Sequence, residues 1–235
     1  MKAVLMAAGL GTRLRPVTNR IPKCMVPIKG IPLLNWWLNH LENHGVTDAL
    51  INLHYLPEVV ISFVREYKGN IKISLVHEPK LLGSQGTLYA NREFLKGSDH
   101  FLVIYADNLT DLNLTAFMKD HFQHPEIVGS MALFHASDPS RCGIVKLDDR
   151  QIVSQFEEKP AFPKSDLANA GVYIFNHRVW EWVQSEVPSD IGFHLMPKLI
   201  GKIFGYIHTG FFMDIGTTQS YQEAIEKWPY EGGKI

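Results

Sequence analysis

The sequence is poor in cysteine and has no long apolar run. Its 235 residues include two cysteines, Cys24 and Cys142, and neither has a second cysteine nearby. This fits a reducing compartment and excludes a four-cysteine zinc site. A transmembrane helix needs roughly 18 to 20 consecutive apolar residues, and no stretch of the chain supplies them. The apolar run after Lys2 stops at Gly9, which is too short for a signal peptide. We therefore expect a cytoplasmic protein without a membrane partner.

An excess of charge of one sign is also missing. The chain has 23 lysine and arginine residues against 24 aspartate and glutamate residues, and its isoelectric point is near 6.8. No global field therefore favours nucleic acid, and we expect no nucleic-acid partner. An anionic ligand would have to be held by a few well-placed basic residues.

Strands and helices alternate over the first half of the sequence. Short apolar runs predict strands, and apolar residues at helical spacing predict helices. Strands are expected at residues 2–7, 49–53, 71–76 and 101–106, and helices at 33–44 and 58–67. Residues 83–95 begin with small residues and are expected to become helical. This alternation is typical of a largely parallel sheet covered by helices on both faces.

The second half changes character, with short strands and tight connections. Strands are expected at residues 131–135, 144–147, 152–156 and 171–175, with a hairpin turn at 148–150. Helical stretches are expected at 179–184, near 194–200 and at 218–227. No composition break marks a domain boundary. We predict one domain over residues 1–235, with a nucleotide half at about 1–125 followed by a more antiparallel substrate half at about 126–235. The fold class is a Rossmann-like α/β fold with a mixed, mostly parallel sheet flanked by helices.

A glycine-rich loop follows the first predicted strand, at the carboxyl end where open α/β sheets bind ligands. Gly9 and Gly11 let backbone N–H groups approach phosphate oxygens, and Arg13 and Lys23 add positive charge. The dinucleotide fingerprint fails because Leu14 stands where a third glycine is needed, and a P-loop sequence is absent. By itself such a Gly-x-Gly turn is more often structural.

The longer pattern is more specific. The chain resembles the sugar-1-phosphate nucleotidyltransferases, also called NDP-sugar pyrophosphorylases, and among them the compact mannose- and heptose-1-phosphate guanylyltransferases. The matching segments, in the order of the family, are residues 9–18 with 22–23, 83–88, 106–107, 156–160, 169–173 and 214–217. The resemblance implies the nucleotide-diphospho-sugar transferase type of fold.

The resemblance also implies roles for individual residues. Catalysis is assigned to Arg13, Lys23 and Asp107, and a Mg²⁺ ion to Asp107 and Asp214. The nucleotide-binding residues implied are Ala8, Gly9, Gly11, Thr12, Arg13, Lys23, Glu78, Gly83 and Ser84. The sugar-phosphate residues implied are Asn108, Gly143, Glu158, Lys159, Asn169 and Gly171.

The residue types suit these roles. Mg²⁺ prefers oxygen ligands and usually shares its coordination with substrate phosphates, so two carboxylates at strand ends can hold it. Either aspartate alone is more often a turn or helix-cap residue. The segment from Gly83 to Thr87 precedes a predicted helix, whose N-terminus can face a base or phosphate; N-capping by Ser84 is the alternative. Gln85 replaces the small residue common in the family, which leaves the base open.

The reaction implied joins an NTP to a sugar 1-phosphate, giving an NDP-sugar and pyrophosphate, with GTP and a mannose- or heptose-type 1-phosphate favoured. The alternatives are UTP, CTP or dTTP with another sugar phosphate, a non-sugar phosphate such as phosphocholine, and a non-catalytic homologue that senses nucleotide sugars. A glycosyltransferase is disfavoured because Asn108 and Leu109 break the Asp-x-Asp pattern after Asp107. The tail at residues 228–233 could serve as a homo-oligomer contact.

Overall fold

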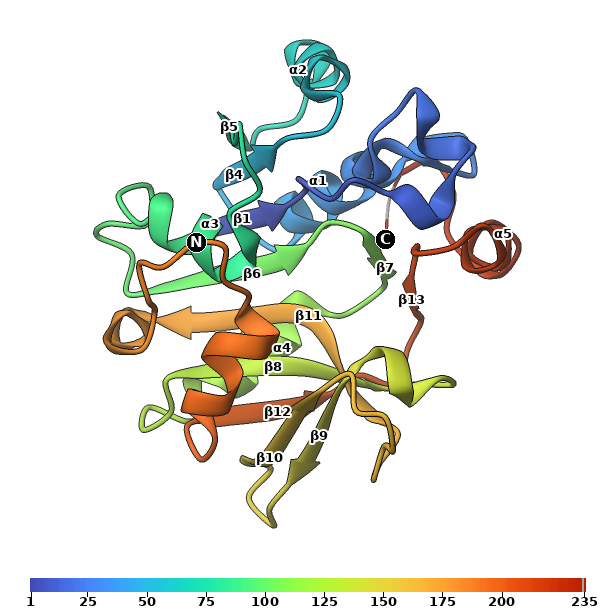
Figure 1. The fold of residues 1–235 in the computed structure, drawn as a ribbon. Coiled ribbons are helices and arrows are strands. Elements are labelled where there is room, and N and C mark those ends of the chain that lie inside the picture. The colour runs from blue at the N-terminus through green and yellow to red at the C-terminus, as the bar shows by residue number, and fades with distance from the viewer. Residues whose placement is uncertain (234) are drawn as a thin grey trace. The chain divides into compact units, whose positions relative to one another are not determined.

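The computed structural model describes residues 1–233 and 235 (Figure 1). It divides into two compact units, each assembled from separate stretches of the chain. Unit 1 comprises Met1–Leu81, Ile104–Leu112 and Gly210–Ile235, and unit 2 comprises Leu82–Val103 and Asn113–Thr209. Strand β6, His100–Tyr105, passes from unit 2 into unit 1. The strands form a mixed, mostly parallel sheet flanked by helices, so the predicted fold class is confirmed.

Unit 1 is built on three parallel strands. β1 (Lys2–Met6) pairs with β4 (Asp48–Leu53), and β4 pairs with β5 (Lys72–His77). Its helices are α1 (Leu33–Asn43), α2 (Pro57–Glu66) and α5 (Thr218–Lys227), and its short helical turns are η1 (Thr12–Leu14), η2 (Val17–Asn19) and η3 (Lys23–Met25). Two small antiparallel pairs complete it, β2 (Pro27–Ile28) with β3 (Ile31–Pro32) and β7 (Asn108–Thr110) with β13 (Phe212–Asp214).

The core of unit 1 follows from its apolar pattern. Leu5 and Ile51 on the parallel strands are completely buried, as expected for strands covered on both faces. Trp36 on α1 is 1% exposed, and its ring meets that of Trp228 edge to face, with 5.4 Å between the ring centroids. This contact ties the end of α5 to α1, and it uses the preferred geometry of aromatic pairs.

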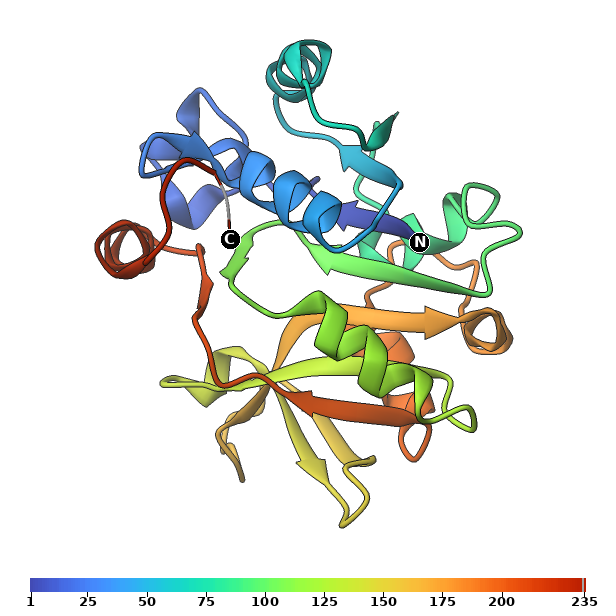
Figure 2. The same cartoon turned by 180° about the vertical axis from the view of Figure 1, so that it is seen from behind.

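Unit 2 has a more antiparallel arrangement. β11 (Leu167–Asn176) pairs antiparallel with β8 (Gly129–His135), and β8 pairs parallel with β12 (Ile203–Ile207). β9 (Gly143–Leu147) and β10 (Val153–Glu158) form the hairpin at the bottom of Figure 1. α4 (Leu114–Phe122) packs against β8 and β12 (Figure 2). The remaining elements are α3 (Gly83–Ala90), η4 (Pro139–Arg141), η5 (His177–Glu181), η6 (Ile191–Leu195) and η7 (Met196–Leu199).

Most predicted elements are present, and the departures have physical causes. The hairpin turn at residues 148–150 is confirmed, with Asp148 Oδ1 accepting from the backbone N of Arg150 and Ile152 at 2.9 Å each. The helical stretches predicted at 179–184 and near 194–200 are present as the short helical turns η5, η6 and η7, shifted by a few residues and without a regular α-helix. Pro197 lacks an N–H group, which prevents a regular helix across the second segment. The helix predicted to reach residue 95 ends at Ala90.

No helix among the described residues is both long enough and apolar enough to cross a membrane.

Candidate functional site

The glycine-rich loop is anchored at its start by a buried polar network in unit 1. The backbone N of Ala7, just after β1, donates to Asn52 Oδ1 at 2.7 Å. The Asn52 amide in turn donates to Glu78 Oε1 at 3.0 Å, and both side chains are 3% exposed. A buried amide needs partners to offset its desolvation. Glu78 therefore supports the loop through Asn52, a contact that sequence analysis did not assign to it.

The loop turns sharply at Gly11. This residue has a φ of +62°, in the left-handed region that favours glycine. An added Cβ would lie 3.0 Å from Thr18 Cγ2, and the Thr18 hydroxyl donates to the Gly11 carbonyl at 2.7 Å. Tyr55 holds the far end of the loop by donating to the Thr18 carbonyl at 3.0 Å. Arg13, within η1, is exposed, so its guanidinium faces solvent from a fixed backbone.

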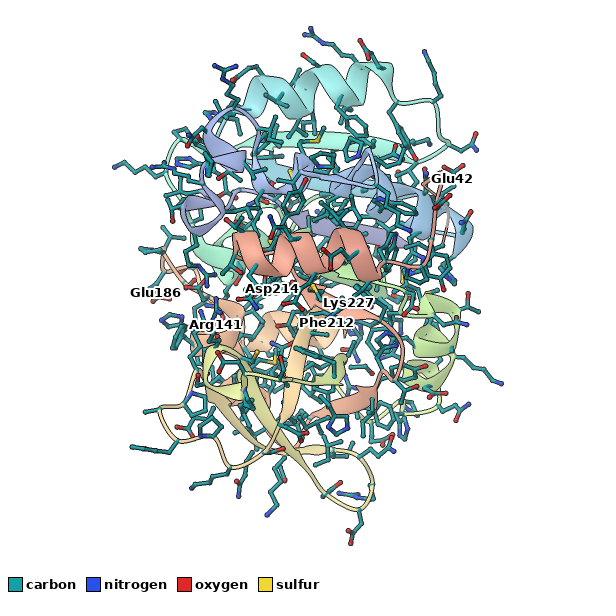
Figure 3. All side chains as sticks on the ribbon, turned by 90° about the vertical axis from the view of Figure 1, so that its right-hand side faces the viewer. Glu42, Arg141, Glu186, Phe212, Asp214 and Lys227 are labelled. Atoms are coloured by element: carbon teal, nitrogen blue, oxygen red, sulfur yellow. The ribbon has the colours of Figure 1, made fainter. Side chains whose placement is uncertain are left out.

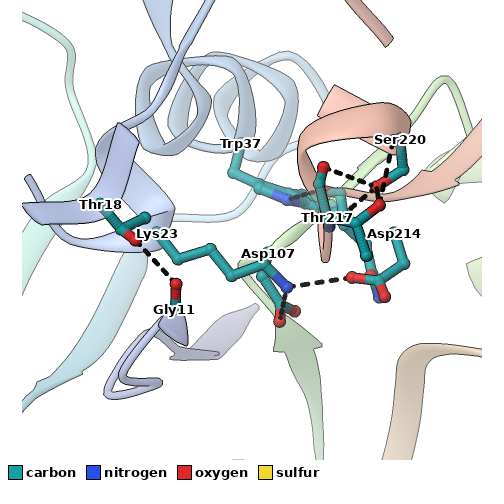
Figure 4. A network of polar contacts seen from close by, with 9 residues as sticks. Gly11, Thr18, Lys23, Trp37, Asp107, Asp214, Thr217 and Ser220 are labelled. Atoms are coloured by element: carbon teal, nitrogen blue, oxygen red, sulfur yellow. Dashed lines mark hydrogen bonds and ion pairs between the residues drawn. The ribbon is translucent and has the colours of Figure 1, made fainter. Parts of the chain in front are cut away.

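Lys23 joins the two predicted metal-binding aspartates. Its Nζ lies 2.6 Å from Asp107 Oδ2 and 3.0 Å from Asp214 Oδ1, while the residue is only 8% exposed (Figure 4). In the sequence, Asp107 lies 84 positions and Asp214 lies 191 positions after Lys23. Three residues of the family pattern that the sequence places far apart are thus in direct contact.

The strands explain why the two carboxylates converge. In the antiparallel pair of β7 and β13, Asp214 stands opposite Asn108, the residue after Asp107. The backbone N of Ile215 donates to the Asp107 carbonyl at 3.0 Å, which fixes both chain segments. Asp214 lies at the end of β13, beside α5 (Figure 3). The helix is capped by Thr217 with Ser220, so Asp214 is not its N-cap.

The charge of Lys23 is stabilised in spite of its burial. Burial alone would lower the pKa of Lys23, but the charges of Asp107 and Asp214 and their hydrogen bonds outweigh it, so the pKa lies above its ordinary value. The ammonium group is therefore protonated at neutral pH. Removing both carboxylates would leave the Lys23 ammonium uncompensated in a largely buried position, which is costly, whereas removing one leaves the other as its partner.

The same geometry indicates that the two aspartates suit a divalent cation. Among the described residues, no group of three or more His, Cys, Asp or Glu side chains is arranged to hold a metal ion. Mg²⁺ does not need such a cage, because it is commonly bound by one or two carboxylates together with substrate phosphates. Asp107 and Asp214 already direct oxygens at one cationic nitrogen. The donor set therefore fits Mg²⁺.

The N-terminus of α3, in unit 2, is arranged differently from the expectation. The backbone N groups of Gln85 and Gly86 donate to the Ser189 carbonyl at 2.9 and 3.1 Å, and that of Ser84 donates to Asp190 Oδ1 at 3.3 Å. The donors expected to face a base or phosphate are thus paired within the protein. Ser84 does not cap the helix either, because its Oγ accepts from the backbone N of Ile191 at 2.8 Å.

Gln85 departs from the family pattern in a way that the structure makes visible. Its side chain is completely buried, and neither of its amide atoms has a hydrogen-bond partner among the described residues. A small family residue would carry no such desolvation cost. The side chain is not accessible from solvent, so its expected effect on the base stays a prediction.

Glu158 and Lys159 lie at the end of β10, where Glu158 pairs with Gly143 of β9. An added Cβ on Gly143 would lie 2.7 Å from Glu158 Oε2, and one on Gly192 would lie 2.4 Å from the same atom. The carboxylate is therefore seated between two glycines. Burial, and then the charge of Asp190, raise the pKa of Glu158, whereas Lys159 opposes the shift. The Lys159 Nζ lies 3.8 Å from Glu158 Oε1.

Backbone geometry at this position is constrained. Lys159 has a φ of +50°, which a side chain adopts at a cost of about 1–2 kcal/mol. Its backbone N donates to the Cys142 carbonyl at 3.0 Å, which holds the residue in place. Lys29, Leu56 and Gln151 have the same left-handed backbone, so this conformation does not by itself mark Lys159 as functional.

Asn169 and Gly171 lie on an irregular stretch of β11. The pairing of β11 with β8 shifts between Asn169 and Tyr173, and Gly171 in the bulge has a φ of +67°. Asn169 Oδ1 accepts from the backbone N of Gly171 at 2.9 Å, and its Nδ2 donates to the Tyr173 hydroxyl at 2.6 Å. The amide of Asn169 thus stabilises the bulge.

The predicted site residues fall into two groups. Unit 1 contains Ala8, Gly9, Gly11, Thr12, Arg13, Lys23, Glu78, Asp107, Asn108 and Asp214, and unit 2 contains Gly83, Ser84, Gly143, Glu158, Lys159, Asn169 and Gly171. Within unit 1 the structure joins Lys23 to both aspartates, and within unit 2 it joins Glu158 to Gly143 and Lys159. The roles of these residues toward substrates stay predictions.

Two supporting residues escaped sequence analysis. Asn52 is a polar residue in the apolar strand β4, and that interruption is a signal that could have drawn attention to it. Asp190 accepts a hydrogen bond from the Ser84 backbone N, which lies 106 positions earlier in the sequence. Nothing in the sequence around Asp190 predicts this contact.

Comparison with known proteins identifies the family. Residues 2–230 match the nucleotidyl transferase family. A UTP–glucose-1-phosphate uridylyltransferase of Synechocystis sp. is 35% identical over 96% of this chain and 62% of the relative. A mannose-1-phosphate guanylyltransferase catalytic subunit beta of Danio rerio is 32% identical over 94% of this chain and 62% of the relative. The chain thus spans about three fifths of the length of these curated relatives.

Solved structures agree on the fold. HddC from Yersinia pseudotuberculosis superposes with a TM-score of 0.81 at 26% identity, covering 97% of this chain and 99% of that one. A putative glucose-1-phosphate thymidylyltransferase from Bacillus anthracis superposes with a TM-score of 0.86 at 23% identity, covering 99% and 98%. The chain belongs to the nucleotidyl transferase family.

Proposed function

We propose that this chain condenses an NTP with a sugar 1-phosphate, giving an NDP-sugar and pyrophosphate. The observation that carries the proposal is the buried Lys23 ammonium between Asp107 and Asp214, in a chain that matches the nucleotidyl transferase family from residue 2 to residue 230. Relatives named for this reaction with mannose 1-phosphate and with glucose 1-phosphate support it.

The reaction asks little covalent work of the protein. An oxygen of the sugar 1-phosphate attacks the α-phosphorus of the NTP in line, a new P–O bond forms, and the bond to the β-phosphate breaks as pyrophosphate leaves. Catalysis then depends on positioning and on neutralising charge. Arg13 and Lys23 stabilise the negative charge on the leaving pyrophosphate, and the loop around Gly11 brings backbone N–H groups to the triphosphate.

Asp107 and Asp214 are the residues that would hold Mg²⁺. When bound, the ion would supply charge neutralisation and orientation of the phosphate oxygens. The carboxylates are kept close by the pairing of β7 with β13, so the protein need not reorganise its backbone to present them.

The residues of unit 2 bind the sugar phosphate in this proposal. Glu158 accepts hydrogen bonds from sugar hydroxyls, for which it must be ionised, and Lys159 pairs with the phosphate. Lys159→Ala is expected to weaken sugar-phosphate binding more than NTP binding.

For the substrates, we propose GTP with a mannose- or heptose-type 1-phosphate first. The mannose-1-phosphate guanylyltransferase of Danio rerio supports this pair. UTP with glucose 1-phosphate is the second candidate, because the relative named for that pair is 35% identical to this chain.

A substrate matrix tests the proposal. The full chain is incubated with Mg²⁺ and each of four NTPs against mannose, heptose, glucose and amino-sugar 1-phosphates, with phosphocholine as a non-sugar acceptor, and pyrophosphate release is measured. We expect release with at least one sugar 1-phosphate. Release with phosphocholine alone would refute the sugar assignment. No release from any pair would favour a non-catalytic, nucleotide-sugar-sensing homologue.

A further inference from the structure

Phe193 presents a large apolar ring to solvent in a short turn where it and His194 are the exposed residues. It belongs to η6, in which Ile191, Gly192 and Leu195 are buried, while Phe193 is 54% exposed. A single exposed aromatic residue is ordinary. What distinguishes this one is the set of contacts that fix the turn and the polar groups around it.

One side of the turn is fastened to α3. The carbonyl of Ser189 accepts from the backbone N of Gln85 and Gly86, and the Ser189 N donates to the Leu82 carbonyl at 2.9 Å. An added Cβ on Gly83 would lie 2.4 Å from the Ser189 carbonyl oxygen, so the two backbones are in close contact. These contacts fix the position of the segment that leads into η6, and with it the position of Phe193.

The other side of the turn supports Glu158. Gly192, next to Phe193, offers the surface on which the Glu158 carboxylate rests, and any side chain there would displace that carboxylate. The Lys159 Nζ lies 6.0 Å from the centre of the Phe193 ring. This is the outer limit of a cation–π attraction, so the ring does not hold the ammonium group. A carboxylate, an ammonium group and an aromatic ring therefore neighbour one another within unit 2.

These three groups match the three chemical parts of a sugar 1-phosphate. Hydroxyls suit the carboxylate, and the phosphate suits the ammonium group. A pyranose also has an apolar face of C–H bonds, and binding sites commonly combine an aromatic surface with a few convergent polar groups. We infer that Phe193 is a specificity-determining residue that packs against the C–H face of the sugar ring. The inference rests on the proposed function and assigns the ring contact that Glu158 and Lys159 do not provide.

The test compares three variants by steady-state kinetics and by calorimetric binding. Phe193→Ala should raise the KM for the sugar 1-phosphate about three- to tenfold and leave the KM for the NTP unchanged. Phe193→Tyr keeps the ring and should restore the wild-type KM. Phe122→Ala is the matched control, because Phe122 is 52% exposed, belongs to unit 2 and lies on α4. It should leave both KM values unchanged.

A probe without a ring separates a sugar contact from a general disturbance. Phe193→Ala should weaken binding of the sugar 1-phosphate and leave binding of inorganic phosphate unchanged. Equal loss for both ligands, an unchanged KM for the sugar phosphate, or an equal effect of Phe122→Ala would overturn the inference. If the wild type is active and Phe193→Ala matches it, only the inference fails. If the wild type releases no pyrophosphate with any substrate pair, the proposed function fails and the inference fails with it.

Discussion

The cost of removing a charge from water normally keeps a lysine ammonium group out of a protein interior. Lys23 is buried because two carboxylates compensate its charge. Its contacts with Asp107 and Asp214, at 2.6 and 3.0 Å, occupy oxygens that we propose for a divalent cation. Lys23 and such a cation would therefore compete for the same carboxylates when no nucleotide is bound.

Lys23→Met tests this competition. Loss of the ammonium group should raise the affinity for Mn²⁺, used as a paramagnetic substitute for Mg²⁺ and titrated without nucleotide, by about tenfold or more. Turnover should fall by about 10²–10³, because a preorganised contact to the phosphates is lost. Lys29→Met is the control, since Lys29 lies in unit 1 and pairs with Glu231 instead. An unchanged Mn²⁺ affinity in Lys23→Met would contradict the competition.

Glu158 carries a pH dependence with a definite sign. Burial, reinforced by Asp190, raises its pKa above the ordinary value of 4.5, so its ionised form is lost at a higher pH than usual as the solution is acidified. As the pH falls, kcat/KM for the sugar 1-phosphate should therefore decrease as Glu158 becomes protonated. Asp190→Asn keeps the acceptor oxygen for Ser84 and removes the negative charge, so this decrease, the acid limb of the pH profile, should move to lower pH. A limb that persists unmoved in both Asp190→Asn and Glu158→Gln would belong to the substrate phosphate.

At the scale of elements, the contact between α3 and the segment before η6 depends on a glycine. Gly83 has a φ of +74° and lies against the Ser189 backbone, whereas Gly97 has a φ of +77° with nothing within 4 Å of an added Cβ. Both belong to unit 2. The pair therefore separates the cost of a left-handed backbone from the cost of a steric clash.

Gly97→Ala should lower the free energy of unfolding by about 1–2 kcal/mol, from backbone strain alone. Gly83→Ala should lower it by about 2–5 kcal/mol, because the clash with Ser189 adds to that strain. Urea denaturation measures both. Equal losses would show that the segment at Ser189 yields without cost, and that the α3 contact does not hold it in place.

At the scale of elements, local patterns in the sequence predicted strands and helices, whereas long-range contacts could not be predicted from it. Apolar runs located β1, β4 and α1 because their pattern is local, and the family pattern located Lys23, Asp107 and Asp214. The donors at the N-terminus of α3 were assigned to a ligand, yet Ser189 and Asp190 satisfy them from about 100 residues away. A hydrogen bond between residues so far apart has no signal in the sequence near either residue. Likewise the η turns after Asp190 follow from Pro197 and tertiary packing rather than from apolar spacing.

At the scale of the whole chain, the residues proposed for the reaction lie in both units. Unit 1 contains the glycine-rich loop with Lys23, Asp107 and Asp214, and unit 2 contains Glu158, Lys159 and Phe193. The family match covers residues 2–230, as the extent of the motifs along the sequence predicted. The identity of the base could not be derived in the same way, because Gln85 departs from the family at the position implied to contact the base.

The most direct test of the central claim is product analysis by ³¹P NMR for the wild type, Asp107→Asn and Asp214→Asn. With a suitable NTP, a sugar 1-phosphate and Mg²⁺, the wild type should form NDP-sugar and pyrophosphate in equal amounts. Each variant should lose about 10²–10³ in turnover, with urea denaturation confirming that it remains folded. A wild type that forms neither product, or a folded Asp107→Asn that turns over at nearly the wild-type rate, would contradict the account.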